Sequence, residues 1–299
     1  MGACAPVRCR GLRSTAASCY DKGMWRTILY PTDFSETAEN AFPHALTLAV
    51  LLNARLVLLH VRVLMQDDPD NPRFHFPQME EIYREAEEIA RGILDLRKGS
   101  TPHPEVTTRI RRGLTADDVI LLSAQEEQAE LIVMGTHGRR GLDLALLGST
   151  VQAVAKKASI PVCTVRKDVP SPDPELPYRR ILVPVDFSPG SARALKTAAG
   201  LAKATGGTLL ILHVLNDGDA KEAGHRLKAL AAPLSLPGAE TLVLEGTPEE
   251  IILQEARRMP ADAIVMSKKG RSFLEYVLLG SVTERTIHMA PCPVISLPV

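Results

Sequence analysis

Two short loops in this chain have the residue types and spacing that could hold a phosphate group. The first begins at Gly135 after the apolar run Ile132-Val133-Met134 and reaches Gly138, and nine residues then separate it from Gly148-Ser149. The second begins at Ser267 after Ile264-Val265-Met266 and reaches Gly270, and nine residues again separate it from Gly280-Ser281. Each loop joins a β-branched run to a predicted helix start. Glycine there lets the backbone approach an anion, and the free N–H groups of the helix stabilise it.

The two loops differ at their first residues. Ser267 stands where the first loop has Gly135. If this position requires a positive φ, the serine costs about 1 kcal/mol, which is small against nucleotide binding, so loss of the second site does not follow. Lys268 and Lys269 replace Thr136 and His137. These lysines either face phosphates or are solvated loop charges, and we favour the second reading.

Carboxylates and histidines near the predicted strand ends are the other candidates. Asp33 and Asp186 could accept hydrogen bonds from a ribose hydroxyl or a base amine, or each could cap the helix that follows it. Gly148-Ser149 could likewise be a plain helix N-terminus without a ligand. His60 and His213 have no Cys, Ser or carboxylate motif beside them, so we expect structural roles. The chain has no Walker lysine motif, nucleophile elbow, paired-carboxylate pattern or metal-ligand spacing. We therefore expect no catalytic residue and no metal-binding residue.

Both loops belong to a repeat that runs through the chain. The segment Ile-Leu-Tyr-Pro-Thr-Asp-Phe-Ser at 28–35 recurs as Ile-Leu-Val-Pro-Val-Asp-Phe-Ser at 181–188, and Leu-His-Val at 59–61 recurs at 212–214, both at an offset of 153. The Gly-Ser pair recurs at an offset of 132, so the second copy lacks 21 residues between these points. The Pro- and Asp-rich stretch 66–78 of the first copy predicts a surface insertion or lid.

Within each copy, short apolar runs alternate with helical stretches. In the first copy we expect strands near 26–31, 55–61, 105–110, 130–134 and 161–166, and helices near 36–52, 79–97, 115–127 and 149–158. This alternation predicts an α/β fold of two tandem domains, each a five-stranded parallel, doubly wound sheet with helices on both faces; the family resemblance described below implies that these domains are Rossmann-like. The predicted domains are 24–168 and 178–299, joined by a proline-rich linker, 169–177. Residues 1–23 are expected to be a disordered extension or a misplaced translation start, with an Arg-rich transit peptide as the weaker option.

Each copy ends in an apolar strand that needs a neighbour. These strands are Ile160–Val165 and Cys292–Leu297. A bare strand edge is an aggregation hazard, so we expect the two to pair within one chain as a pseudo-twofold dimer. The alternative is that each edge is short and tolerated alone, and a further homodimer is also open.

The repeated motifs resemble those of the universal stress protein (UspA-like) family, in its tandem two-domain form, over residues 25–299. The resemblance implies domains like those of the adenine nucleotide alpha hydrolases, which bind ATP or another adenine nucleotide, with Mg²⁺ as an optional companion. In the first copy it implies a site formed by Pro31, Thr32, Asp33, Val61, Met134, Gly135, Gly138, Gly148, Ser149 and Thr150. In the second copy the matching positions are Pro184, Val185, Asp186, Val214, Met266, Gly270, Gly280, Ser281, Val282 and Thr283.

Composition excludes several other classes of partner. Lys plus Arg and Asp plus Glu number 35 each, and aromatic residues make up 4%, so neither a charge field nor a stacking platform for nucleic acid is expected. No apolar run reaches the roughly 20 residues that span a bilayer. The five cysteines form no CxxC pair, which favours a reducing compartment, the cytoplasm.

Three functions remain open at this stage. We favour an adenine-nucleotide-binding module of the stress response, in which ATP shifts domain or partner geometry. The alternatives are an enzyme of the same fold, such as a slow ATPase or a nucleotidyl-transferring ligase, and a scaffolding tandem with both sites vacant.

Overall fold

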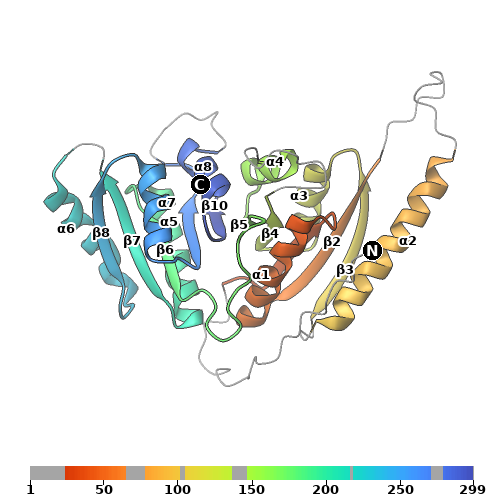
Figure 1. Ribbon diagram of the computed structural model, residues 1–299, viewed down its shortest axis with the longest axis horizontal. Coiled ribbons are helices and arrows are strands. Elements are labelled where there is room, and N and C mark those ends of the chain that lie inside the picture. The colour runs from red at the N-terminus through yellow and green to blue at the C-terminus, as the bar shows by residue number, and fades with distance from the viewer. Residues whose placement is uncertain are drawn as a thin grey trace.

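A single ten-stranded β-sheet runs through both halves of the chain (Figure 1). The computed structural model describes residues 24–64, 78–101, 105–136, 147–215, 218–270 and 279–298. The strand order is β3-β2-β1-β4-β5-β10-β9-β6-β7-β8. Pairing is parallel within β1 to β5 and within β6 to β10, which we call the first and second half. The predicted pair of five-stranded parallel sheets is therefore confirmed.

The first half alternates strands and helices in the predicted order. Its elements are β1 (Thr27–Thr32), α1 (Glu36–Leu52), β2 (Arg55–Val63), α2 (Met79–Ser100), β3 (Val106–Gly113), α3 (Ala116–Glu126), β4 (Leu131–Gly135), α4 (Ser149–Lys157) and β5 (Val162–Val165). The second half repeats the order with β6 (Arg180–Pro184), α5 (Pro189–Thr205), β7 (Thr208–Leu215), α6 (Ala220–Ala231), a short 3-10 turn (Ala232–Leu234), β8 (Glu240–Glu245), α7 (Pro248–Arg258), β9 (Ala263–Ser267), α8 (Ser281–Met289) and β10 (Val294–Leu297).

The two halves join through their terminal strands. β5 and β10 pair antiparallel, with Cys163 opposite Ile295. Both side chains are fully buried. The predicted pairing of the two apolar edge strands is confirmed, and it converts two sheets into one.

Local sequence signals set the helix ends. Ser35 and Ser188 are the N-caps of α1 and α5, and each side-chain oxygen accepts a hydrogen bond from a backbone N–H of the first turn. Asn53 and Gly206 end the same helices in the left-handed conformation. Equivalent caps at equivalent positions make the chain turn from strand to helix in the same way in both halves.

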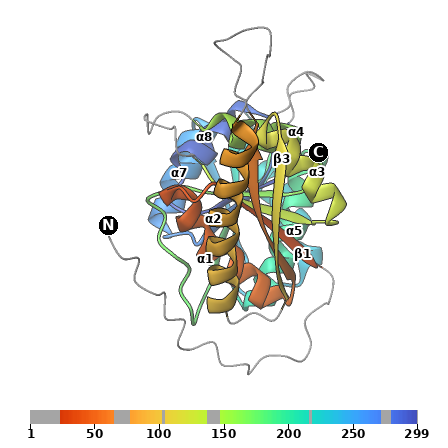
Figure 2. The same ribbon diagram turned by 90° about the vertical axis from the view of Figure 1, so that its right-hand side faces the viewer.

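Helices cover both faces of the sheet. Side chains of α1, α2, α5 and α6 pack in one buried cluster, and those of α3, α4, α7 and α8 pack in a second. Figure 2, which looks along the sheet from the side of α2, shows α1 and α3 on opposite faces. Each cluster takes residues from both halves, so neither half has a core of its own.

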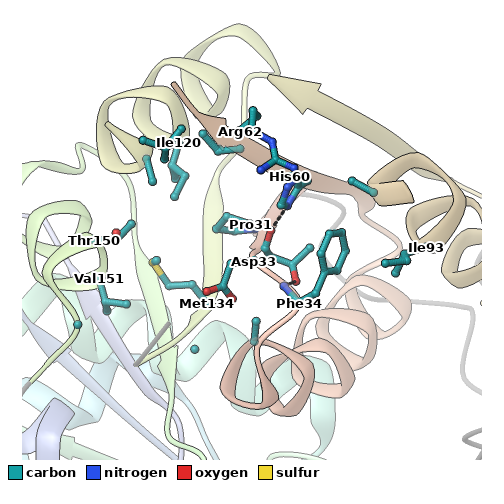
Figure 3. Close-up of a pocket in the computed structure, with 18 of the residues that line it drawn as sticks. Pro31, Asp33, Phe34, His60, Arg62, Ile93, Ile120, Met134, Thr150 and Val151 are labelled. Atoms are coloured by element: carbon teal, nitrogen blue, oxygen red, sulfur yellow. Dashed lines mark hydrogen bonds between the residues drawn. The ribbon is translucent and has the colours of Figure 1, made fainter. Parts of the chain in front are cut away.

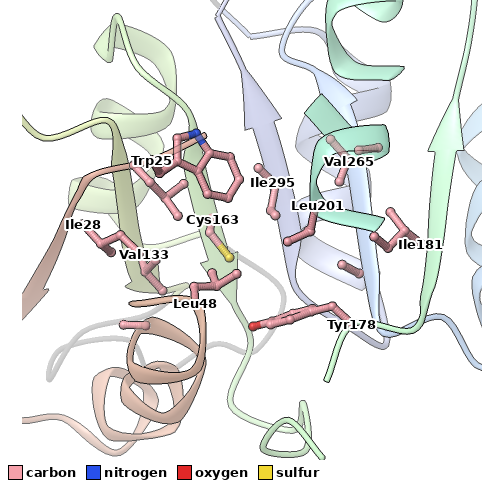
Figure 4. Close-up of a cluster of buried hydrophobic side chains, with 14 of the residues drawn as sticks. Trp25, Ile28, Leu48, Val133, Cys163, Tyr178, Ile181, Leu201, Val265 and Ile295 are labelled. Carbon is pink, nitrogen blue, oxygen red and sulfur yellow. The ribbon is translucent and has the colours of Figure 1, made fainter. Parts of the chain in front are cut away.

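The first cluster is continuous across the junction of β5 and β10 (Figure 4). Trp25 and Tyr178, 5% and 2% exposed, lie in it beside Cys163 and Ile295. Val169, the first residue of the predicted linker, is also buried there. Burial of large apolar side chains from both ends of the linker stabilises the placement of one half against the other.

Helix accounts for part of the extra length of the first copy. Helix α2 has 22 residues, whereas its counterpart α6 has 12. Part of the 21-residue difference is therefore extra helix that continues the amphipathic pattern, and α2 begins at Met79, where a helix was predicted to start. Residues 66–77 of the predicted lid lie outside the described residues, as do residues 1–23. No helix in the described part of the chain is long and apolar enough to cross a membrane.

Candidate functional site

A cavity of about 840 Å³ opens in the first half where β1, β2 and β4 end (Figure 3). Strand order reverses between β1 and β4, since β2 lies beyond β1 and β5 beyond β4. In doubly wound sheets, ligands bind in the crevice at this reversal. The cavity volume lies within the range of small-molecule sites.

The structure brings the predicted first-copy residues together at this cavity. Its lining includes Pro31, Thr32, Asp33, Val61, Met134, Gly135, Gly148, Ser149 and Thr150. These residues come from three strand ends and from the first turn of α4. Gly138, like His137, lies outside the described residues.

The start of α4 lies at one end of the cavity with its backbone donors uncapped. Gly148 is the N-cap of this nine-residue helix, and no side chain caps it. The N–H groups of a first helical turn have no partner within the helix, and they carry the positive end of the helix dipole. Ser149 and Thr150 add hydroxyl groups beside them. The arrangement suits an anion such as a phosphate.

Asp33 does not cap helix α1. Its Oδ1 accepts a hydrogen bond from the Ser35 N–H (3.0 Å), and Ser35 is the cap. Asp186 repeats this turn with Ser188 (3.0 Å). The helix-cap alternative for the two carboxylates is therefore wrong, because each lies two residues before the cap in an Asx turn.

The residue after each aspartate is a phenylalanine with a positive φ. Phe34 has φ 61° and Phe187 has φ 62°. Bulky residues adopt this region at a cost of about 1–3 kcal/mol, and such costs concentrate at functional sites. Here the turn holds the carboxylate at the strand end and lays each aromatic ring against a histidine, with ring centroids 4.7 Å apart for Phe34 and His60.

His60, inside β2, and His213, inside β7, tie neighbouring strands together. His60 Nδ1 is 2.9 Å from the Thr32 carbonyl, and His213 Nδ1 is 2.7 Å from the Val185 carbonyl. Both side chains are buried. This repeated bond between β2 and β1, and between β7 and β6, fits the structural role expected from the sequence.

Gly135 is required for a different reason from the one considered from the sequence. Neither Gly135 nor Ser267 has a positive φ. A Cβ on Gly135 would lie 2.5 Å from the Thr37 carbonyl oxygen, because the first turn of α1 crosses the end of β4. The backbone penalty at Ser267 therefore does not arise, and close packing decides this position.

The second half accommodates Ser267 through another glycine. Gly190 occupies the place of Thr37 in the repeat, and a Cβ on it would lie 2.4 Å from the Ser267 Oγ and 3.1 Å from its Cβ. Loss of the side chain at one position thus makes room for the side chain at the other. The absence of a side chain at Gly190 therefore compensates for the extra volume of Ser267.

Sequence reasoning missed the wall of the cavity that α2 provides. Ala86, Ile89, Ala90 and Ile93 line it, and Ile89 remains 66% exposed. The spacing of these residues predicts an amphipathic helix. It gives no sign that the helix covers the site, which depends on how α2 packs.

A cation in the cavity was missed as well. Arg62 follows Val61 in β2 and lines the cavity beside His60 (Figure 3). Its Nε is buried, and among the described residues it has no hydrogen-bond partner. The signal was present in the repeat, since the second copy has Leu215 at this place.

A model of the universal stress protein family matches residues 24–166 and again residues 177–298. The chain belongs to this family. A universal stress protein of Mycobacterium tuberculosis is 26% identical over 290 residues, which cover 90% of this chain and 95% of the relative. One from Mycolicibacterium smegmatis is 30% identical over 287 residues, covering 89% and 95%. The crystal structure of a universal stress protein from Archaeoglobus fulgidus superposes with a TM-score of 0.71 at 26% identity, covering 91% and 98%.

The structure describes the glycine loop of the second half of this universal stress protein as far as Gly270. In the second half, a Cβ on Gly270 would lie 2.7 Å from Asp186 Oδ2, so the loop lies directly against the carboxylate. Gly280 precedes α8 as Gly148 precedes α4, and Ser281 follows it. Val282, however, replaces Thr150, and the Thr283 hydroxyl donates to the Ser267 carbonyl (2.9 Å). At the described helix start, the second half therefore offers a ligand the Ser281 hydroxyl, where the first half offers those of Ser149 and Thr150.

The remaining second-copy residues occupy the equivalent strand ends. Pro184 ends β6, Val185 and Asp186 follow it, Val214 lies in β7, and Met266 lies in β9. Lys268 does not face this site, because its Nζ donates to backbone carbonyls of the first half. Both readings of Lys268 from the sequence are therefore wrong. Within the described ranges, no group of three or more His, Cys, Asp or Glu side chains could hold a metal ion.

Proposed function

We propose that the cavity of the first half binds an adenine nucleotide, in the first place ATP, and that the protein is a nucleotide-responsive module of the stress response. The observation that carries this proposal is the convergence of nine motif residues on one cavity at the reversal of strand order. Phosphates would lie at Gly148, Ser149 and Thr150, where uncapped helix N–H groups stabilise negative charge. The adenosine would lie toward Asp33 and Val61, with the Asp33 carboxylate accepting from a ribose hydroxyl or the base amine.

We further propose one nucleotide per chain. The second half keeps the strand ends, but its loop lies against Asp186 and its Thr283 hydroxyl is already bonded within the protein. A ligand there would have to displace these contacts, and lost hydrogen bonds cost about 1 kcal/mol each. The first half offers the hydroxyls of both Ser149 and Thr150 at the equivalent helix start.

Matched substitutions in the two repeats test the proposal. Gly148→Val and Gly280→Val place the same side chain at the start of α4 and of α8. Isothermal titration with ATP should give one site per chain for the wild type and for Gly280→Val, and no binding for Gly148→Val. Far-UV circular dichroism of each variant checks that the fold is retained.

The outcomes separate the parts of the proposal. Absence of ATP binding by the wild type, or unchanged affinity in a folded Gly148→Val protein, overturns the first-half site. If the wild type binds two ATP molecules per chain and Gly280→Val binds one, the proposal of one nucleotide per chain is overturned. The first-half site then still stands.

A further inference from the structure

Lys268 connects the glycine loop of the second half to the first half. It directly follows β9, at the repeat position held by Thr136 in the first half. Its Nζ donates to the carbonyl oxygens of Ala158 (2.9 Å) and Lys156 (3.1 Å). Both acceptors lie at the end of α4. Thr136 carries a short hydroxyl side chain in place of the lysine ammonium group.

The end of α4 is a favourable place for this ammonium group. The last carbonyls of a helix lack partners within the helix, and a cation there interacts with the negative end of the dipole. Lys268 is half-buried, and this burial lowers its pKa, with the nearby Lys269 adding to the effect. The two carbonyl acceptors offset part of the cost of removing the ammonium from water.

A second contact holds the middle of α4 to the second half. Gln152 Nε2 donates to Glu284 Oε1 on α8 (2.6 Å). The Lys268 carbonyl in turn accepts from the Gly280 N–H (2.8 Å), which directly precedes α8. Lys268 is therefore bonded through its main chain to the start of α8 and through its side chain to the end of α4.

The opposite end of α4 forms the phosphate end of the cavity. Gly148, Ser149 and Thr150 line the cavity, and the helix is only nine residues long. So short a helix has little stability of its own, and its placement depends on tertiary contacts. A contact that fixes its last turn also fixes the N–H groups of its first turn, because the helix moves as a rigid unit.

We propose that Lys268 is a positioning residue that couples the second half to nucleotide binding in the first. It holds α4 so that the uncapped first turn is preset for phosphate, and it links that turn to the start of α8. This inference rests on the proposed nucleotide site. Because coupling is reciprocal, a nucleotide that orders α4 also strengthens the contact with α8 in the other half.

The test compares Lys268→Met with Lys269→Met as the matched control. Lys269 is the neighbouring lysine; its backbone N–H donates to Ser267 Oγ, and among the described residues its side chain has no hydrogen bond or ion pair with α4. We expect Lys268→Met to weaken ATP binding by about tenfold, within the usual range of coupling between sites. Lys268→Arg, which keeps a cation at the helix end, should recover most of the affinity, and Lys269→Met should bind like the wild type.

Hydrogen exchange supplies a readout that a general loss of stability would not produce. In the wild type, ATP should slow amide exchange in α8, Ser281–Met289, although the nucleotide lies in the other half. In Lys268→Met this slowing of α8 should disappear even at saturating ATP. Without nucleotide, the amides of α4 should exchange faster in Lys268→Met than in Lys269→Met.

Three results would overturn the coupling. These are wild-type ATP affinity in Lys268→Met, ATP-induced protection of α8 that persists in that variant, and unchanged exchange of α4 in its nucleotide-free form. If the wild type binds no ATP, the proposed function fails instead, and the exchange rates of nucleotide-free α4 still decide whether Lys268 positions the helix.

Discussion

The contact between Gly190 and Ser267 permits a double-mutant cycle that measures how the second half adjusted to its serine. A methyl group on Gly190 would lie 2.4 Å from the Ser267 Oγ and 3.1 Å from its Cβ. Rotation of the hydroxyl can relieve the first contact. The second contact requires one of the two backbones to move, so Gly190→Ala should introduce overpacking of about 1–3 kcal/mol.

A gain in helix propensity partly offsets this cost. Gly190 lies in the first turn of α5, where alanine is favoured over glycine by up to about 1 kcal/mol. In the presence of Ser267, we therefore expect Gly190→Ala to destabilise the protein by about 1 kcal/mol. In a Ser267→Gly background the clash is absent, and the same change should be neutral or stabilising.

Urea denaturation of the four proteins gives the coupling energy. We expect about 1–3 kcal/mol, well above the roughly 0.5 kcal/mol seen for independent sites. Gly135→Ala in the first half extends the comparison: the group it meets is the Thr37 backbone, which cannot rotate away, so this change should cost more than Gly190→Ala. A coupling energy near zero would refute the compensation between Gly190 and Ser267.

Three further predictions follow from described contacts. Burial lowers the pKa of His44 from 6.5 to about 4, so the folded protein keeps it neutral while the unfolded chain protonates. The contribution of neutral His44 to the free energy of unfolding should be fully present above pH 6.5. Below pH 6.5 the free energy of unfolding should fall by up to about 1.4 kcal/mol per pH unit, down to about pH 4. Urea titrations at several pH values should show a shallower slope for His44→Gln, and an identical slope would contradict this assignment. Ile295→Ala removes a fully buried side chain at the junction of the halves and should cost about 2–5 kcal/mol; calorimetry should show one transition shifted as a whole, because the halves share their core. Arg62→Leu replaces the arginine with the residue found at this place in the second copy. It should weaken ATP binding about tenfold, as the loss of a charged hydrogen bond does. An affinity equal to that of the wild type, measured by titration calorimetry, would count against a role for Arg62.

Much of the fold could be predicted from the sequence because its signals are local and repeated. Apolar runs of strand length, serine caps and the constant offset of 153 fix the order of elements in both halves. The pairing of β5 with β10 followed from a single physical requirement, that two apolar edges need partners. The strand-end position of the motif residues likewise followed from where each apolar run stops.

The rest depends on contacts between distant segments. Lys268 contacts α4 only because the two halves pack in one particular way. The role of Gly190 is visible only beside Ser267, and the cavity wall on α2 requires the length and direction of that helix. A repeat comparison aligns residues that share a place in each half, so it cannot show which residues meet across the halves.

The antiparallel junction of β5 and β10 has a consequence for how this protein can change over generations. In a twofold homodimer, every interface mutation appears twice, once in each subunit. Each change must therefore be compatible with both copies of the contact that the twofold axis relates. Here the two partners are encoded by one gene, and a mutation alters one side alone. Thr136 could therefore stay a small buried residue while its equivalent became a lysine reaching 2.9 Å from a carbonyl of the opposite half. A single chain thus lets each half change independently while it keeps their ratio at one to one.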